Sequence, residues 1–289
     1  WKDGQVVDWM PASDADIDYA LALVFADKKW GSKHPSGLDA YAVKASAILK
    51  DILRLETFSS DSGRLYLLPW IIESNSQSRL PLNPSYYSPA AFRIFYAHTK
   101  DKRWLDLTDT TYFVLNKLSD NFLGIDGKGL LPDWCSVDRK SEQLFSLEGK
   151  NSGFGYEAVR IAFRLYLDYS WFKSRQARGI LGKISAFAED HWDKDKVIYC
   201  EYDYNATALK KYESPLFYAA YACALSAGRS RYFNEVLAKS RSFLKKQGKL
   251  WFYYDKEDYY VNSLAWFTEG FLSGIIKDIT ENSLRINYE

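Results

Sequence analysis

The chain has 289 residues, of which 47% are hydrophobic and 26% are charged, a composition typical of a globular protein. Its formal net charge of +1 gives no field that would attract nucleic acid or an anionic membrane, so neither is an expected partner. The 3 cysteines and 3 histidines are scattered, which argues against a disulfide framework, a metal site and a histidine-based triad; no cofactor is expected.

Aromatic residues are the unusual part of the composition, with 10 Trp, 22 Tyr and 17 Phe. Their rigid, amphipathic rings can stack on the apolar C–H faces of sugars. Most of them must still be core residues, so this composition is only a first indication of a carbohydrate partner.

The first predicted helix covers residues 16–28, with Ser13 or Asp14 as its N-cap. Several acids stand at its start, where the helix dipole favours negative charge, and an unbroken apolar run follows over residues 20–26. A helix that is apolar all round is expected to be buried all round. This segment therefore predicts a buried helix that directs acids toward whatever lies beyond its N-terminus.

Helical periodicity and turn residues predict eight more helices, over residues 38–53, 83–96, 104–118, 156–169, 174–190, 215–225, 231–245 and 260–276. Short extended pieces are predicted at residues 64–70, 196–204 and 250–254. The chain shows no alternation of strands and helices, no glycine-rich phosphate loop and no linker. We therefore expect one all-α domain over residues 1–289, built from helical hairpins that bury their apolar faces on one another.

Two loops carry acids that could do chemistry, residues 13–16 and residues 132–134. Paired carboxylates across a sugar-binding groove are the usual equipment for glycoside hydrolysis, in which one protonates the leaving oxygen and the other activates water or attacks carbon. Taken singly, Asp14 fits a helix cap and Asp133 fits a turn residue equally well.

Four segments, in the right order, resemble the motifs of glycoside hydrolase family 8. They are Ala12-Ser13-Asp14-Ala15-Asp16 with Ala20, Ala22, Ala26 and Trp30; Asn83-Pro84-Ser85-Tyr86; Leu131-Pro132-Asp133-Trp134-Cys135; and Tyr156-Glu157-Ala158-Val159-Arg160 with Arg164. The resemblance covers most of the chain and implies an (α/α)6 barrel that hydrolyses glycans with inversion. The resemblance also favours chemical roles for Asp14 and Asp133 over the cap and turn interpretations, because unrelated caps and turns would not occur together with the other segments in this order.

The resemblance implies roles for particular residues. Asp133 would be the general base, Asp14 would bind the sugar ring at the cleaved subsite, and Tyr86 would hold the nucleophilic water. Arg160 and Arg164 would orient the acids from behind them, together with Glu157, which stands where the family usually has Asp. Tyr260 lies in a segment that resembles a family Tyr-Tyr-Asp, and the stacking platforms or pocket walls are expected among Trp1, Trp30, Trp70 and Trp134.

Family members carry their general acid on a Glu in a helical hairpin that precedes the segment matched by residues 12–16. Residues 1–11 contain no such motif. We therefore expect the N-terminal hairpin and the general acid to be absent from this chain, with the domain incomplete at its N-terminus.

The resemblance implies a polysaccharide partner, endo-acting cleavage of a β-1,4-linked glycan such as a cellulose-like glucan or an exopolysaccharide, and a monomer. One alternative is a polysaccharide lyase or unsaturated-glycan hydrolase on a similar barrel, and another is a non-catalytic glycan-binding relative. Because polymeric glycans lie outside the cytoplasm, we expect an extracellular or periplasmic protein, with a membrane anchor possible only upstream of residue 1.

Overall fold

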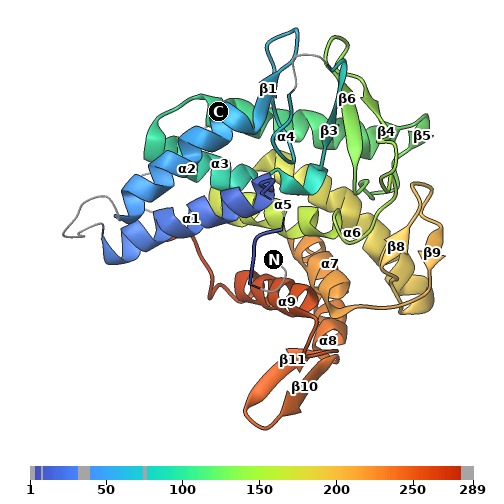
Figure 1. The fold of residues 1–289 in the computed structure, drawn as a ribbon. Coiled ribbons are helices and arrows are strands. Elements are labelled where there is room, and N and C mark those ends of the chain that lie inside the picture. The colour runs from blue at the N-terminus through green and yellow to red at the C-terminus, as the bar shows by residue number, and fades with distance from the viewer. Residues whose placement is uncertain (1–3, 8, 32–39, 74–76, 281–289) are drawn as a thin grey trace.

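The computed structural model describes residues 4–7, 9–31, 40–73 and 77–280 (Figure 1). Helices dominate this part of the chain, as the sequence predicts. There are nine α-helices in it, namely α1 (Ser13–Trp30), α2 (Tyr41–Leu55), α3 (Pro89–Thr99), α4 (Arg103–Asp120), α5 (Val159–Phe172), α6 (Arg175–Asp195), α7 (Pro215–Gly228), α8 (Phe233–Arg241) and α9 (Tyr259–Leu272).

The helices form successive antiparallel hairpins that stand side by side in an arc. Along the chain α1 packs on α2, α3 on α4, α5 on α6 and α7 on α8. The first members of the hairpins also pack on one another in the order α1, α3, α5, α7 and α9, while α4 packs on α6 in a second layer. Figure 1 shows α5 near the centre of this arrangement. None of the helices in the described residues is long and apolar enough to cross a lipid bilayer.

Helix α7 is the most deeply buried element, because α5, α6, α8 and α9 all pack against it. Pro215 occupies its first turn, where the missing N–H costs nothing, and Arg229 ends it in the left-handed region. Every residue of the helix except Ser226 and Gly228 is buried. The apolar-all-round pattern thus belongs to a helix that has neighbours on every side.

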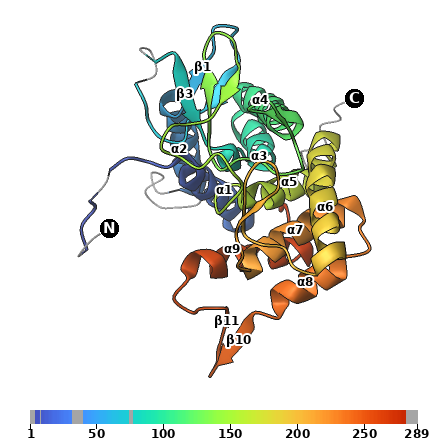
Figure 2. The same ribbon diagram turned by 90° about the vertical axis from the view of Figure 1, so that its right-hand side faces the viewer.

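Short strands connect the helices. They are β1 (Thr57–Ser59), β2 (Leu65–Leu67), β3 (Arg79–Leu82), β4 (Asn121–Phe122), β5 (Ile125–Asp126), β6 (Cys135–Asp138), β7 (Leu144–Phe145), β8 (Glu201–Tyr202), β9 (Ala208–Lys210), β10 (Leu244–Gln247) and β11 (Leu250–Tyr253). All the pairs are antiparallel, and β3, β6 and β7 form a three-stranded sheet. In both views this sheet lies at the opposite end of the molecule from the projecting β10–β11 hairpin (Figures 1 and 2).

The expectation that the first helix is buried all round is wrong. In α1 only Ser13, Ile17, Ala20, Leu23 and Val24 are buried, and they form one face of the helix. Helices α2 and α3 cover that face. The opposite side is open to solvent, where the side chain of Tyr19 is 54% exposed. The predicted N-cap is also shifted, because the cap position is Ala12 and the Ser13 hydroxyl instead donates to the Leu68 carbonyl, at 2.7 Å.

The predicted helix over residues 231–245 is too long. Helix α8 ends at Arg241, and the following residues form β10, whose Lys246 lies opposite Trp251 in β11. Gly248, at φ 61°, supplies the left-handed turn residue of this hairpin. The pairing with residues farther along the chain therefore overrides the local helical pattern.

Candidate active site

The loop that carries Asp133 is fixed by a neighbouring loop. The Asp133 N–H donates to the Gly153 carbonyl at 2.7 Å, and the Trp134 N–H donates to the Asn151 carbonyl at 3.0 Å. Strand β6 begins immediately afterwards and pairs with β3 on one side and β7 on the other. The sheet therefore holds Asp133 close to the N-terminal end of α5.

The Asp133 carboxylate is buried, and its hydrogen-bond donors within the described part of the chain are neutral. Asn151 Nδ2 donates to Oδ2 at 2.7 Å, while the N–H groups of Ala158 and Glu157 donate to Oδ1 at 2.8 and 3.2 Å. Burial raises the pKa of Asp133 to about 6, and these hydrogen bonds lower it only in part. The side chain therefore changes its charge close to neutral pH.

Gly155 allows the backbone to approach this carboxylate. A Cβ atom at residue 155 would lie 2.7 Å from Asp133 Oδ2, which is closer than atoms in contact can come. Glycine is therefore required for close approach here, although its φ is ordinary.

Asp14 reaches the same cluster from the first turn of α1. Its Oδ2 atom lies 2.6 Å from Arg160 Nη1, and the Arg160 side chain also forms an ion pair with Glu157. Asn83 Nδ2 donates to Glu157 Oε2 at 2.7 Å. Arg160 thus joins α1 to α5, and its charge is shared between two carboxylates.

Two tyrosines complete the cluster. Burial, together with the nearby Asp14 and Glu157 charges, raises the pKa of Tyr86 to about 12. Tyr260, at the start of α9, donates its hydroxyl to the Tyr156 carbonyl at 2.6 Å. Burial likewise raises the pKa of Tyr260 to about 12, and the charges that act on it include Asp133 and Asp14. Both phenols therefore stay protonated at neutral pH and remain hydrogen-bond donors.

Aromatic rings border the acids. The ring centroid of Trp134 lies 5.8 Å from that of Trp70 and 6.1 Å from that of Tyr86. Trp134 is buried, whereas Trp70 is half-buried and can offer part of a ring face. Trp1, the remaining candidate for substrate binding, lies outside the described residues.

Two of the predicted residues lie away from the acids. Arg164 is buried and pairs with Asp18, at 3.0 Å between Nη1 and Oδ1, which ties α5 to α1 one helical turn below the Arg160–Asp14 pair. It therefore orients neither Asp14 nor Asp133 directly. Trp30 ends α1, and a helix of this length spans about 27 Å, so its 69% exposed ring is remote from Asp14.

Sequence reasoning missed three contributors to the site: Asn151, Asn83 in its contact with Glu157, and Gly155. Asn83 belongs to a recognised segment, but nothing in that segment indicates its partner. Asn151 lies in a polar loop, where an asparagine ordinarily indicates a turn. Only the folded chain brings Asn151 and Gly155 to Asp133, and Asn83 to Glu157.

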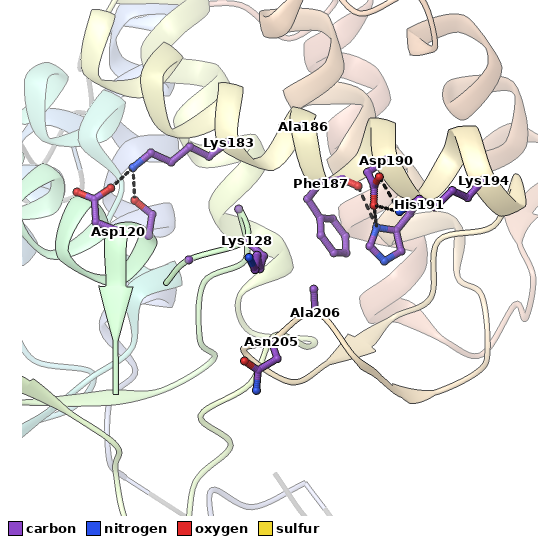
Figure 3. Close-up of a pocket in the computed structure, with 13 residues that line it drawn as sticks. Asp120, Lys128, Lys183, Ala186, Phe187, Asp190, His191, Lys194, Asn205 and Ala206 are labelled. Carbon is purple, nitrogen blue, oxygen red and sulfur yellow. Dashed lines mark hydrogen bonds and ion pairs between the residues drawn. The ribbon is translucent and has the colours of Figure 1, made fainter. Parts of the chain in front are cut away.

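A cavity of about 790 Å³ lies elsewhere, between α6, the loop after β5 and the loop between β8 and β9 (Figure 3). None of the predicted site residues lines it. Its two carboxylates are already paired, Asp120 with Lys183 and Asp190 with Lys194. Within the described residues no group of three His, Cys, Asp or Glu side chains could hold a metal ion.

The arc of helical hairpins is found in solved structures. The chain aligns with the apo structure of the β-1,3-1,4-glucanase from Paenibacillus sp. X4 at a TM-score of 0.74 and 23% identity, over 93% of this chain and 68% of that one. Similarity of this kind shows the fold, which is the (α/α)6-barrel class. The family follows from the sequence itself. The chain belongs to glycosyl hydrolases family 8, whose sequence model matches residues 2–271.

Curated relatives agree with this assignment. Endoglucanase A of Acetivibrio thermocellus is 29% identical over 263 residues, which are 91% of this chain and 50% of that protein. Endoglucanase 2 of Ruminiclostridium josui is 32% identical over 176 residues, or 61% of this chain and 34% of that protein. The chain thus spans half or less of the length of these two relatives.

Proposed function

We propose that this protein hydrolyses a β-1,4-linked glycan within the polymer and inverts the anomeric carbon, with Asp133 as the general base. The observation that carries the proposal is the buried Asp133 carboxylate, which pairs with no cation among residues 4–7, 9–31, 40–73 and 77–280 and whose pKa burial raises to about 6. Such a group accepts a proton from water at neutral pH, as inversion requires. The names of the relatives, endoglucanases, support a cellulose-like glucan as the substrate.

The other residues of the cluster have distinct roles in this proposal. Asp14 binds ring hydroxyls of the sugar at the cleaved bond, because its ion pair with Arg160 fixes the position of its carboxylate at the start of α1. Tyr86 helps to hold the attacking water, and Glu157 fixes the Arg160 guanidinium. Trp70, Trp134 and Tyr260 line the glycan path.

The proton donor is a further part of the proposal. Asp14 and Glu157, the acids that share the cluster with Asp133, are both held in ion pairs with Arg160, which leaves neither of them free to approach a leaving oxygen. We infer that a Glu on a helical hairpin upstream of residue 1 supplies the proton. In inverting enzymes such an acid lies about 6.5–9.5 Å from the base, so that water fits between them.

We propose that the protein acts as a monomer. We also propose that it acts outside the cytoplasm, because its polymeric substrate lies there. An exopolysaccharide of the producing cell is a second possible substrate of the same linkage class. Membership of a hydrolase family is the reason for setting the polysaccharide lyase alternative aside. The non-catalytic alternative is an outcome of the test below.

The test uses the full-length protein with soluble cellulose and xylan. New reducing ends should appear, and NMR should show that the first product has the opposite anomeric configuration. Asp133→Asn should lower turnover by about 10²–10⁴-fold or more while oligosaccharide binding persists. Asp126→Asn, which changes an exposed carboxylate on β5, is the matched control. Turnover that survives Asp133→Asn would contradict the base assignment, and binding without turnover in the unaltered protein would support the non-catalytic alternative.

A further inference from the structure

Glu56 is the cap residue that follows α2, and its carboxyl group interacts with acids in the first turn of α1. The residue is 3% exposed, and its carbonyl accepts from the Leu68 N–H at 2.7 Å. The Leu68 carbonyl in turn accepts from the Ser13 hydroxyl at 2.7 Å, and the Ser13 N–H donates to the Pro69 carbonyl at 3.2 Å. The backbone next to Glu56 thus anchors the start of the helix that carries Asp14.

The surroundings of the Glu56 carboxyl group are unfavourable for a negative charge. Its Oε2 atom is buried and accepts no hydrogen bond. The charged groups that act on it are Asp16, with which it shares a side-chain hydrogen bond, and Asp14, both on α1. An ionised carboxylate here would be buried beside two like charges, which costs several kcal/mol without a cationic partner.

A proton on Glu56 removes this conflict. Two carboxylates accept hydrogen bonds only, so a bond between Glu56 and Asp16 requires that one of them be protonated. Burial, together with the hydrogen bond to Asp16 and the charges of Asp16 and Asp14, raises the pKa of Glu56 to about 8. Glu56 is the more buried of the two and therefore the one that keeps the proton.

We propose that Glu56 is a positioning residue: as a neutral carboxylic acid it donates a hydrogen bond to Asp16 and thereby holds the first turn of α1, with Asp14, against Arg160. The consequence of this hydrogen bond for glycan binding rests on the proposed function. The protonation of Glu56 and its effect on the stability of the protein do not. When Glu56 loses its proton, three carboxylates repel one another at this turn and Asp14 loses its fixed position.

The protonation is tested by NMR of the full chain with ¹³C-labelled glutamate carboxyl groups. One resonance should titrate with a midpoint near 8, and Glu56→Gln should remove it. Asp16→Asn should move the midpoint to lower pH, since it deletes one of the repelling charges. Asp51→Asn, which changes an exposed carboxylate on the same helix, should leave it unchanged. If all glutamates titrate near the usual value of 4.5, the proposal is wrong.

The positioning role is tested by the binding of cellohexaose to the Asp133→Asn protein, in which the ligand is not consumed. Affinity should fall above pH 8, and adding Glu56→Gln should abolish that fall, because the neutral amide still donates to Asp16. Below pH 8 Glu56→Ala should weaken binding about tenfold, the effect of losing about 1.4 kcal/mol, and Glu56→Gln should restore it. An alkaline fall that persists in Glu56→Gln would overturn the role.

The two proposals fail in different ways. If cellohexaose binds at no pH, the proposed function is wrong, and the pH dependence of thermal unfolding still decides the role of Glu56. The folded chain keeps a proton that the unfolded chain loses above pH 4.5, so stability should decline from about pH 4.5 to about pH 8. Glu56→Gln should remove that decline while Asp51→Asn retains it; an unchanged decline in Glu56→Gln would overturn the proposal.

Discussion

Asp133 and Asp14 lie in one cluster, but their partners give them different chemistry. Asp14 faces the Arg160 guanidinium at 2.6 Å, whereas the donors to Asp133 among the described residues are the amide of Asn151 and backbone N–H groups, all of them neutral. A permanent cation fixes the charge of a carboxylate, and neutral donors leave it able to exchange a proton. This difference supports the proposal that Asp14 binds the sugar and that Asp133 acts as the base.

The base assignment has a pH signature. Because Asp133 must be ionised, kcat/KM should fall about tenfold for each pH unit below 6, where burial has placed the pKa of this group. Asn151→Ala removes a donor that favours the ionised form, so the acid limb should move to higher pH. Asn121→Ala, which removes a surface donor to Asp126, is the control. An acid limb that stays in place in Asn151→Ala would contradict the role of this hydrogen bond.

Gly155 gives a steric test of the same site. In Gly155→Ala the new methyl group must push the Asp133 carboxylate aside, because only 2.7 Å separates them. Turnover should fall by at least about tenfold, since small misplacements of a catalytic group are costly. Gly179→Ala on α6, where the added carbon meets nothing within 4 Å, should preserve activity and stabilise the helix by up to about 1 kcal/mol. Equal activities of the two variants would exclude the steric explanation.

Pairs of buried polar side chains join the helices to one another. Arg93 on α3 binds the fully buried Asp168 on α5, at 2.7 Å between Nε and Oδ1. Tyr112 on α4 donates to the same carboxylate and lies 3.1 Å from the Ser174 hydroxyl at the start of α6. The Asp168 carboxylate thus joins α3, α4 and α5, and Tyr112 extends the network to α6. The carboxylate requires these partners because it has no access to water.

Removing the cation of this network should destabilise the protein strongly. Arg93→Met leaves the Asp168 charge buried without a guanidinium and should lower the free energy of unfolding by about 3–5 kcal/mol. Arg103→Met breaks a surface pair with Asp101 and should cost less than about 1 kcal/mol. Urea unfolding of both variants measures the difference. Similar losses of unfolding free energy in the two variants would mean that the burial of Asp168 does not add to the cost of removing its cationic partner.

Sequence patterns predicted the elements well where local signals and packing agree. Helix α7 has an apolar run, a proline in its first turn and neighbours on every side, so pattern and burial coincide. Helix α1 has a similar run, but α2 and α3 cover only one face of it. The hydrophobic pattern shows which residues a helix can bury, and the packing of neighbouring helices determines how many of these residues are buried.

At the scale of the whole molecule, the packed layer α1, α3, α5, α7 and α9 brings distant parts of the chain together. Asp14 and Arg160 are 146 residues apart in sequence, and the adjacent Arg164–Asp18 pair spans the same separation. Two buried hydrophobic clusters support this arrangement, one centred on α1 to α3 and the other on α4 to α9 with the connecting strands. The site is therefore a property of the assembled layer and of no single hairpin.

The balanced charge of the chain predicts how activity responds to salt. With a net charge of +1 and a neutral glucan, KM should change by less than about twofold between low and high ionic strength, because screening acts on charged partners. A steep loss of binding with added salt would instead indicate an acidic glycan as the substrate. Steady-state kinetics on soluble cellulose at two salt concentrations, with a polyuronate as the comparison, decide between them.

By itself, the sequence determined the helical class, the number and approximate positions of the helices, and the segments that carry Asp14, Tyr86, Asp133 and Arg160. These features depend on periodicity, turn residues and short motifs, which are local in the chain. The tertiary structure alone decided the ion pair of Asp14 with Arg160, the donors to Asp133, the partner of Arg164 and the burial of Glu56. Charge states and partners depend on which side chains meet across helices and on how far water is excluded, and neither is encoded locally.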